Sequence, residues 1–379
     1  NALVGYAALR VLQERAGADL PAQAHTSESH FAHGLVDAIV PRPQLRDQVA
    51  LLLDLLMSDY HLSAPGERHA SKLEHTQLGA LQQLQLSRHQ QRPTAADFIA
   101  RIASSFTAIR GDRDGCDDPS IIAGFASIGG EAVVVIGQNR AHERPLEDGW
   151  IRPEGFRKAT RAIGLAAKFD LPVVSLIDTA GAHPALPSEE EGLGHAIAQC
   201  TAALLEASVP TVAVITGEGN SEAAVALGVA DRVLMLDNAV YEVIRPEDAA
   251  VLLDQKDVAE TAERLRITSH DCLKLGLVDA TVPEPGDGAH VDHDEAALLL
   301  RRSLIRELAR LRRQRPGRRL KRRYERYRRV GETRSWVRGT VERRLAHLSD
   351  RLAGAWDRVR GRSHLRRRIE FGDNPDIPV

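Results

Sequence analysis

Cysteine, methionine and aromatic residues are all scarce in this sequence of 379 residues. The three cysteines, Cys116, Cys200 and Cys272, lie far apart, so the sequence supports neither a disulfide framework nor a Cys-x-x-Cys zinc site. Such sparse cysteine use is typical of a reducing compartment, and we expect a cytoplasmic protein. Aromatic residues make up 4% of the chain, so aliphatic and alanine side chains must fill the core.

Long apolar runs and nucleotide-binding motifs are also missing. No stretch of about 18 apolar residues occurs, so we expect no membrane-spanning helix. The opening Asn-Ala-Leu-Val-Gly-Tyr has neither the charged region nor the apolar region of a secretory signal. Neither Gly-x-x-x-x-Gly-Lys-Ser/Thr nor Gly-x-Gly-x-x-Gly is present, so a nucleotide site is not expected.

The net charge of −2 hides an uneven distribution. Residues 301–379 contain 26 Lys and Arg against 9 Asp and Glu, whereas the rest of the chain is acidic. This asymmetry predicts an acidic globular body and an Arg-rich tail that is helical or partly disordered. The tail could be solvated, or it could contact an acidic partner. Few aromatic side chains are interleaved with its basic clusters, which argues against nucleic acid.

An internal repeat is the most informative feature of the sequence. Residues 32–41 read Ala-His-Gly-Leu-Val-Asp-Ala-Ile-Val-Pro, and residues 274–283 match them at seven of ten positions. Upstream, Asn1-Ala2-Leu3 parallels Asn238-Ala239-Val240, and a Leu-rich helical pattern follows both copies. Only the second copy has a long structured region before it. We therefore expect the chain to begin inside one domain, residues 1–60, and to carry a complete second domain, residues 93–300.

Alternating helix and strand patterns fill the second domain, after a polar linker over residues 61–92. An N-cap signal at Thr94 predicts a helix to about Thr107, and two strands around Gly129-Gly130 predict a hairpin. Further helices are expected over 153–169, 189–207 and 221–229, and strands over 171–177, 210–215 and 232–236. Strands separated by helices indicate parallel βαβ units, and hence an α/β fold.

Two turns follow neighbouring predicted strands. The first runs from Asp178 to Ala182, and the second runs from Gly217 to Ser221 and leads into a helix. Ligands bind at the carboxyl ends of strands in open α/β sheets, and helix N-termini favour developing negative charge. Backbone N–H groups of both turns could therefore form oxyanion holes.

Several motifs resemble the α subunit of bacterial acetyl-CoA carboxylase carboxyltransferase. They are Gly111-Asp112-Arg113, Pro153–Ala159, Gly217-Glu218-Gly219, Gly228–Asp231 and Ile244–Glu247. This α-like resemblance covers about residues 92–310, while residues 1–57 resemble the C-terminal end of the β subunit of the same enzyme. The β-before-α order is similar to that of a fused β/α carboxyltransferase.

The resemblance implies a crotonase-like fold of βαβ superhelical units, one partial and one complete. It implies transfer of a carboxyl group from carboxybiotin, on a separate carrier protein, to acetyl-CoA or another acyl-CoA. The product, malonyl-CoA, would serve fatty acid or polyketide synthesis. Implied partners are a biotin carboxyl carrier protein, a biotin carboxylase and other subunits of an oligomer. No metal is expected in this chain, since the family's zinc ribbon lies in the upstream β part. Met57 and Met235 each follow a leucine, so no Met-Lys-Met site carries biotin here.

The resemblance also implies the site residues. The backbone oxyanion region would be Gly219, Glu222 and Ala223, and the biotin-facing residues would be Thr179, Ala180, Gly181, Ala182, Ser221 and Tyr241.

The sequence departs from the family at this site. The family's second turn reads Gly-Glu-Gly-Gly-Ser-Gly-Gly-Ala, whereas residues 217–224 read Gly-Glu-Gly-Asn-Ser-Glu-Ala-Ala. Ala8-Leu9 also replaces the usual Gly-Pro of the β tail. Two alternatives therefore stay open. One is a degenerate, non-catalytic subunit that acts by interaction, and the other is a biotin-dependent decarboxylase.

Overall fold

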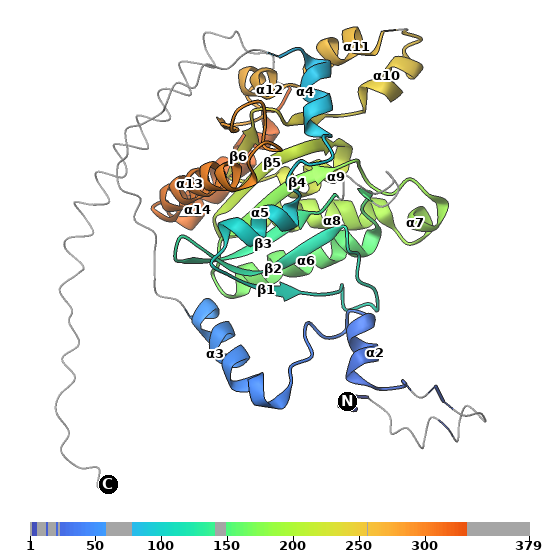
Figure 1. Cartoon of the computed structure of the whole chain (residues 1–379), viewed down its shortest axis with the longest axis vertical. Helices are drawn as coiled ribbons and strands as arrows, with labels where there is room; N and C mark the ends of the chain where they lie inside the picture. Colours follow the sequence, from blue (N-terminus) through green and yellow to red (C-terminus); the bar gives the residue numbers. More distant parts are fainter. Residues whose placement is uncertain are drawn as a thin grey trace, which may run out of the picture. The chain divides into compact units, whose positions relative to one another are not determined.

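A mixed sheet of eight strands forms the centre of the computed structural model, which describes residues 2–5, 13, 20–21, 23–57, 78–140, 149–255 and 257–331 (Figure 1). The strand order is β1-β2-β3-β4-β5-β6-β8, and β7 pairs with a second part of β5. The strands are β1 Ser105–Ile109, β2 Ile121–Ile128, β3 Glu131–Gln138, β4 Val173–Thr179, β5 Thr211–Asn220, β6 Arg232–Leu236, β7 Val240–Glu242 and β8 Ala280–Val282.

The predicted hairpin around Gly129-Gly130 is confirmed, because β2 and β3 pair antiparallel from Ile128 and Glu131 outward. Both glycines have positive φ, of 63° and 91°, as the tight turn of a two-residue hairpin requires. From β3 onward to β8 the pairing is parallel. The expected βαβ units are therefore present.

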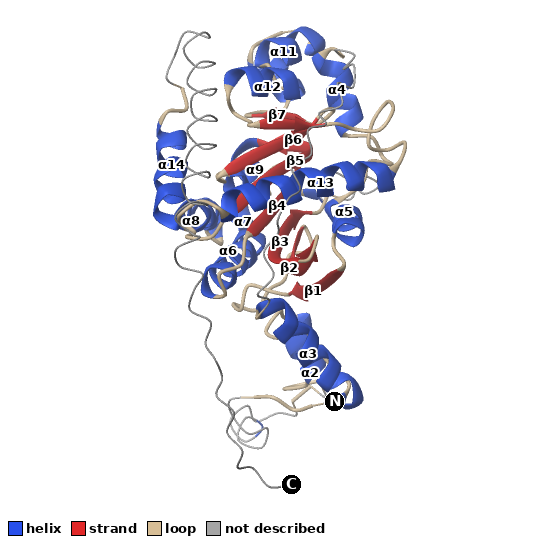
Figure 2. Cartoon of the chain, turned by 90° about the vertical axis from the view of Figure 1, so that its left-hand side faces the viewer, coloured by secondary structure: helices blue, strands red, loops and turns tan. Residues whose placement is uncertain are grey.

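Helices cover both faces of the sheet. Figure 2 shows α6, α8 and α14 on one side and α5 and α13 on the other. The helices of this part are α5 Ala95–Ile102, α6 Pro153–Lys168, α7 Leu186–Glu190, α8 Leu193–Glu206, α9 Ser221–Gly228, α13 His293–Arg312 and α14 Pro316–Arg328. In the part of the chain that the structure describes, no helix is long and apolar enough to cross a membrane.

Two helix predictions were too long. The helix that Thr94 caps through a capping box with Asp97 ends at Ile102, and residues 105–109 form the edge strand β1 instead. Pairing with β2 overrides the weak helical continuation there. The predicted helix 189–207 is two helices, α7 and α8, because Gly192 adopts a left-handed conformation with φ 80° between them.

The segment expected to be a linker is part of the fold from residue 78 onward. Helix α4, Ala80–Ser87, packs with α11, Val258–Leu265, around a small core of Ala80, Leu84, Val240, Ala262 and Ile267. Helix α10, Pro246–Leu252, packs against α11 (Figure 1), and helix α12, Ser269–Leu275, packs against β7 (Figure 2). Residues 61–77 lie outside the described residues.

The expectation of a solvated tail is wrong for residues 301–328. Helix α13 crosses residue 300 without a break and buries leucines such as Leu304 and Leu308 in the main core. In α14 the side chain of Arg323 is fully buried, where it binds Asp231 and carbonyl oxygens at the end of α8. Charge counting missed this, because buried arginines pair with acidic groups far away in the sequence. Residues 332–379 lie outside the described residues.

The internal repeat extends to the backbone geometry of both copies. Leu3 forms an isolated bridge with Thr26, as Val240 does with Thr268. Thr26 and Thr268 each cap a helix, α2 Ser27–Ala32 and α12, and a glycine with positive φ follows eight residues after each threonine. Helix α3, Leu45–Leu56, then follows the first copy as α13 follows the second. The described residues between 2 and 57 therefore repeat these features of the last part of the complete unit.

The repeated Gly-Leu-Val-Asp motif has the same role in both copies. In the second copy, Asp279 accepts a hydrogen bond from the Val233 amide and pairs with Arg232 and Arg326. In the first copy, Asp37 accepts a bond of 2.9 Å from the Arg110 amide.

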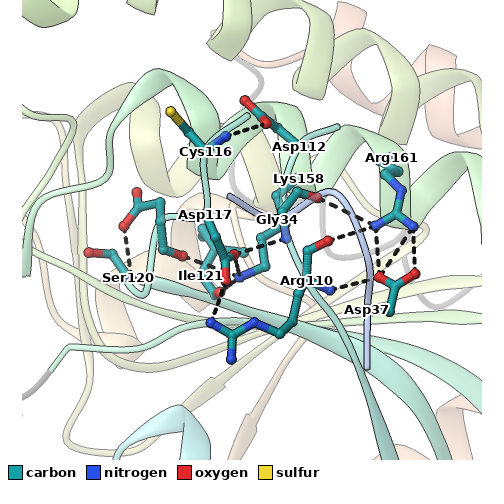
Figure 3. Close-up of polar contacts among 12 residues, drawn as sticks. Gly34, Asp37, Arg110, Asp112, Cys116, Asp117, Ser120, Ile121, Lys158 and Arg161 are labelled. Atoms are coloured by element: carbon teal, nitrogen blue, oxygen red, sulfur yellow. Dashed lines mark hydrogen bonds and ion pairs between the residues drawn. The ribbon is translucent and has the colours of Figure 1, made fainter. Parts of the chain in front are cut away.

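The Asp37 carboxylate also pairs with two arginines of the complete unit. These are Arg161, on α6, and Arg113 (Figure 3 draws the Arg161 pair). Figure 3 also shows the ammonium group of Lys158, which reaches Asp117 Oδ1 at 2.6 Å and the Ile121 carbonyl at 2.7 Å. Lys158 is buried and its hydrogen bonds are satisfied, which indicates a structural role.

Candidate active site at the ends of two parallel strands

The two turns predicted to carry the chemistry lie at the carboxyl ends of the neighbouring strands β4 and β5. Thr179 is the register partner of Gly219, after a shift in register that follows Ile177. Because the strands are parallel, both turns emerge at the same edge of the sheet. The structure thus brings together the two groups of residues that the sequence placed about 40 positions apart.

One part of the prediction needs correction. Residues 217–220 were expected to form a turn after a strand ending at Ile215, but β5 continues to Asn220. Its last three residues pair with β7, so that Gly219 faces Tyr241 and Asn220 faces Glu242. The strand prediction stopped early because glycine and asparagine disfavour strands, whereas here β7 supplies the missing partner.

The first turn holds its backbone through internal hydrogen bonds. The Thr179 hydroxyl accepts a bond of 3.1 Å from the Gly181 amide, and Gly181 has φ 134°, which few other residues adopt. The Gly181 carbonyl accepts from the Ile151 amide at 3.1 Å, and Ala182 bridges to the same residue. Among the described residues, the Ala182 amide donates to no acceptor. This amide is therefore a candidate donor for a ligand.

The second turn is a sharp strand-to-helix corner at Ser221. This residue has φ 58°, an uncommon conformation for a residue with a side chain, and helix α9 begins there. The N-cap residue Asn220 makes no side-chain cap, so the first amides of α9, those of Ser221, Glu222 and Ala223, have no partner within the helix. Such amides and the helix dipole favour a negatively charged oxygen.

The Glu222 side chain is exposed to solvent, and its carboxylate accepts a hydrogen bond from the Ser221 hydroxyl. The neighbouring Ala223 is buried, and its carbonyl accepts a bond of 2.6 Å from Gln138 Nε2 on β3. The first turn of α9 is thereby anchored to the sheet on one side and open to solvent on the other.

Asn220 connects the two turns, and the sequence analysis did not single it out. Its Nδ2 donates to the Ala180 carbonyl at 2.6 Å, while Ala180 itself is buried. The Asn220 Oδ1 atom is buried and has no hydrogen-bond partner among the residues that the structure describes. The sequence did contain an indication of this role, because Asn220 stands where the resembled motif has glycine. An amide side chain at this position can bind the neighbouring turn, which glycine cannot.

Tyr241 lies behind the second turn. A Cβ atom added at Gly219 would come within 3.1 Å of the Tyr241 ring, so the absence of a side chain at Gly219 makes room for the tyrosine. Burial raises the pKa of Tyr241 to about 12, and the phenol is therefore neutral at physiological pH. This position supports the turn from beneath.

A group of buried charges underlies the site, and sequence reasoning missed it. The carboxylate of Glu218 is fully buried and pairs with both Arg88 and Arg140. Although burial opposes ionisation, the charges of Arg140 and Arg88 hold the pKa of Glu218 well below its ordinary value. Arg88 also binds Glu247 at 2.6 Å. The two arginines come from the segments after α4 and β3, so only the tertiary structure could join them.

A second buried ion pair supports the middle of β5. Both Arg92 Nη atoms bind the Glu284 carboxylate, at 3.0 and 2.7 Å, and Arg92 Nε donates to the Thr216 carbonyl at 2.8 Å. Glu284 also accepts from the amides of Asn238 and Ala289. The pair thus links the chain before α5 to the strand that carries the candidate site.

Comparison with known proteins gives a consistent family match. The family model described as acetyl co-enzyme A carboxylase carboxyltransferase-like matches residues 62–331. Over 356 residues the chain is 39% identical to the acetyl-coenzyme A carboxylase carboxyl transferase subunits beta/alpha of Salinispora arenicola, covering 89% of this chain and 62% of that protein. It is 43% identical over 231 residues to the carboxyl transferase subunit alpha of Caulobacter vibrioides, covering 59% and 72%. The chain therefore spans about three fifths of the length of the beta/alpha relatives that it matches.

Solved structures show the same fold. The transcarboxylase 12S hexamer, with hydrolysed methylmalonyl-coenzyme A bound, aligns with TM-score 0.63 and 18% identity over 83% of this chain and 59% of that chain. A single-chain, multi-domain long-chain acyl-CoA carboxylase aligns with TM-score 0.59 and 16% identity over 80% and 29%. These neighbours confirm the expected crotonase-like α/β fold.

Proposed function

This chain belongs to the acetyl-CoA carboxylase carboxyltransferase family, and we propose that it is a carboxyltransferase that moves a carboxyl group from carboxybiotin to acetyl-CoA. The product would be malonyl-CoA. The family match covers the part of the relatives that this chain spans. The proposal extends this match to the whole activity.

One observation carries the proposal at the level of the site. Two turns with amides that can bind an anion lie side by side, clamped by the hydrogen bond from Asn220 Nδ2 to the Ala180 carbonyl. Carboxyl transfer from the urea group of biotin to the thioester acetyl-CoA develops negative charge on the carbonyl oxygens of both. Fixed N–H groups stabilise such charge. The arrangement therefore suits this chemistry without a side-chain base.

The residues of the second turn have separate roles in this proposal. The amides of Glu222 and Ala223 would donate to a developing oxyanion, and Gly219 would let the strand end come close to the ligand. The exposed Glu222 carboxylate, bound to the Ser221 hydroxyl, would stay outside the donor pair.

The first turn would hold the biotin ring. The Ala182 amide would donate, while Thr179, Ala180 and Gly181 fix its direction. Tyr241 would support the second turn, since its ring packs against Gly219. Carboxybiotin, on a separate carrier protein, would supply the carboxyl group. The Ala182 amide, which donates to no acceptor among the described residues, suits a ligand that has a C=O group.

Residues 1–57 would belong to a second, β-like unit that binds CoA. Their described part repeats features of the end of the complete unit, including the aspartate that binds a backbone amide and two arginines. Partners in this proposal are a biotin carboxyl carrier protein, a biotin carboxylase and further carboxyltransferase subunits.

The test follows the reverse reaction of the complete gene product. Malonyl-CoA is supplied with biocytin, and acetyl-CoA formation is measured with and without the biocytin. Acetyl-CoA formation that depends on biocytin would support the proposal, and competition between acyl-CoAs would then rank the substrates. A folded protein that binds CoA but gives no turnover would favour the non-catalytic subunit. Turnover without biocytin would point to a decarboxylase.

A further inference from the structure

Glu242 is a buried acidic residue at the candidate site for which neither the fold nor the proposed function gives a role. It is the last residue of β7, its side chain is fully buried, and its register partner is Asn220 at the start of α9. Alternate residues of a strand share one face, so Glu218 and Asn220 lie on the face of the sheet that Glu242 also occupies. An acidic side chain is almost never fully buried unless it is paired.

The charges around Glu242 do not balance. Among the described residues, neither carboxyl oxygen of Glu242 has a hydrogen-bond partner, and Arg88 Nη2 lies 3.9 Å from Oε1, beyond hydrogen-bonding distance. The same Arg88 already binds Glu218 and Glu247, and Arg140 binds Glu218. A third guanidinium group, that of Arg245, lies 4.0 Å from both Glu247 and Asp248. Three guanidinium groups are thus shared among four carboxyl groups, and none of the three is within hydrogen-bonding distance of Glu242.

A proton on Glu242 removes this imbalance. Arg88 Nη2 binds Glu218 Oε1 and lies 3.9 Å from Glu242 Oε1, so the two carboxyl groups flank the same nitrogen atom. Two carboxylates so placed would repel each other unless one is neutral. Burial, and then the charge of Glu218, raises the pKa of Glu242 to about 9. Arg88 opposes this effect and Glu247 adds to it. Glu218 keeps its charge because Arg140 and Arg88 bind it directly.

We propose that Glu242 is a positioning residue, neutral at physiological pH, that donates a hydrogen bond to the Glu218 carboxylate and so fixes the end of β5 from which α9 begins. The proton resides on Glu242 and no bond other than this hydrogen bond forms. The link to catalysis rests on the proposed function, because the end of β5 carries the amides assigned to the oxyanion. The protonation itself does not depend on that function.

The first test compares the pH dependence of unfolding in the wild type and Glu242→Gln. Glutamine keeps the size of the neutral acid and can also donate to Glu218, but it binds no proton. The folded wild type should hold one proton that the unfolded chain releases above its ordinary pKa. Between about pH 5 and about pH 9, the unfolding equilibrium constant of the wild type, divided by that of Glu242→Gln, should therefore rise about tenfold per pH unit.

The matched control is Glu247→Gln, the same substitution in another partner of Arg88. Glu247 is partly exposed, and although burial opposes it, hydrogen bonding to Arg88 lowers its pKa. This variant should follow the wild type over the alkaline range. Parallel pH profiles of the wild type and Glu242→Gln, with lower stability of Glu242→Gln throughout, would show an ionised Glu242 and overturn the proposal.

The second test is infrared spectroscopy of the folded protein at neutral pH. A C=O stretching band of a buried protonated carboxyl group should be present in the wild type and in Glu247→Gln, and absent from Glu242→Gln. If Glu242→Gln does not fold, the wild-type spectrum decides, and absence of the band overturns the proposal. Neither measurement uses turnover. A protein that shows the proton but lacks biotin-dependent activity would therefore keep this inference and lose the proposed function.

Discussion

Replacing Arg92 with methionine should destabilise the protein strongly, although Arg92 lies in a segment that reads as a polar linker. Methionine keeps most of the aliphatic stem but removes the charge and the donors. The Glu284 carboxylate, which binds both Arg92 Nη atoms, would keep only its bonds from the Asn238 and Ala289 amides and a longer one, 3.4 Å, from Asn238 Nδ2. The Thr216 carbonyl would lose the donor Nε at 2.8 Å.

The expected cost follows from the burial of this pair. The side chains of Arg92 and Glu284 are 0% and 2% exposed, and removing one partner of a buried ion pair typically costs about 3–5 kcal/mol. For a unit of this size such a loss lowers Tm by about 6–20 °C. Although burial opposes it, Arg92 lowers the pKa of Glu284, so the pair stabilises the fold above the ordinary pKa of the carboxyl. The cost of Arg92→Met should therefore be complete at neutral pH and shrink below about pH 4.5.

The assay is urea unfolding followed by circular dichroism, at neutral and at acidic pH. Arg101→Met is the matched control, because Arg101 binds Asp294 at 2.8 Å with exposed fractions of 33% and 88%, and exposed pairs contribute about 0–1 kcal/mol. The double variant Arg92→Met/Glu284→Met should recover part of the loss, since it leaves no unpaired charge. A free energy of unfolding for Arg92→Met within about 1 kcal/mol of the wild type would refute the reasoning.

Three further predictions concern the two turns. Ser221→Gly should raise the free energy of unfolding by about 1 kcal/mol, because Ser221 has φ 58°, which strains a residue with a side chain but not glycine. A lower urea midpoint for this variant would show that Ser221 is not strained. Gly181→Ala should lower both Tm and biocytin-dependent turnover, because a side chain is strained at φ 134°; unchanged turnover would remove the first turn from the site. Glu222→Gly should increase biocytin-dependent turnover by removing a carboxylate beside the anion-binding amides, at a cost of about 1 kcal/mol in stability; equal or lower turnover would show that this carboxylate does not oppose the reaction.

Local sequence patterns were sufficient for most of the central strands and helices. The hairpin at Gly129-Gly130 and the helix from Pro153 depend on glycine in a tight turn and proline at a helix start, which act within a few residues. The errors occurred where distant segments decide the structure. β5 extends to Asn220 because β7 pairs with it, and β1 forms because β2 pairs with it. The substitutions near residue 8 lie outside the described residues, so the structure adds nothing to that departure from the family.

The sequence determined where the two turns of the candidate site lie along the chain. The two turns follow neighbouring parallel strands, and the carboxyl ends of such strands always meet at one edge of a sheet. It also contained the repeat, whose threonine cap, glycine and aspartate act through local geometry and so recur in both copies.

Only the tertiary structure decided which charges meet beneath the site. Arg88, Arg140, Glu218 and Glu242 come from four separate segments, and nothing in their sequence spacing brings them together. The protonation of Glu242 likewise depends on burial and on the charge of Glu218, which exist only after folding. Sequence sets the local conformation through short-range sterics and hydrogen bonds, whereas the energy of a buried charge depends on every group that the fold places around it.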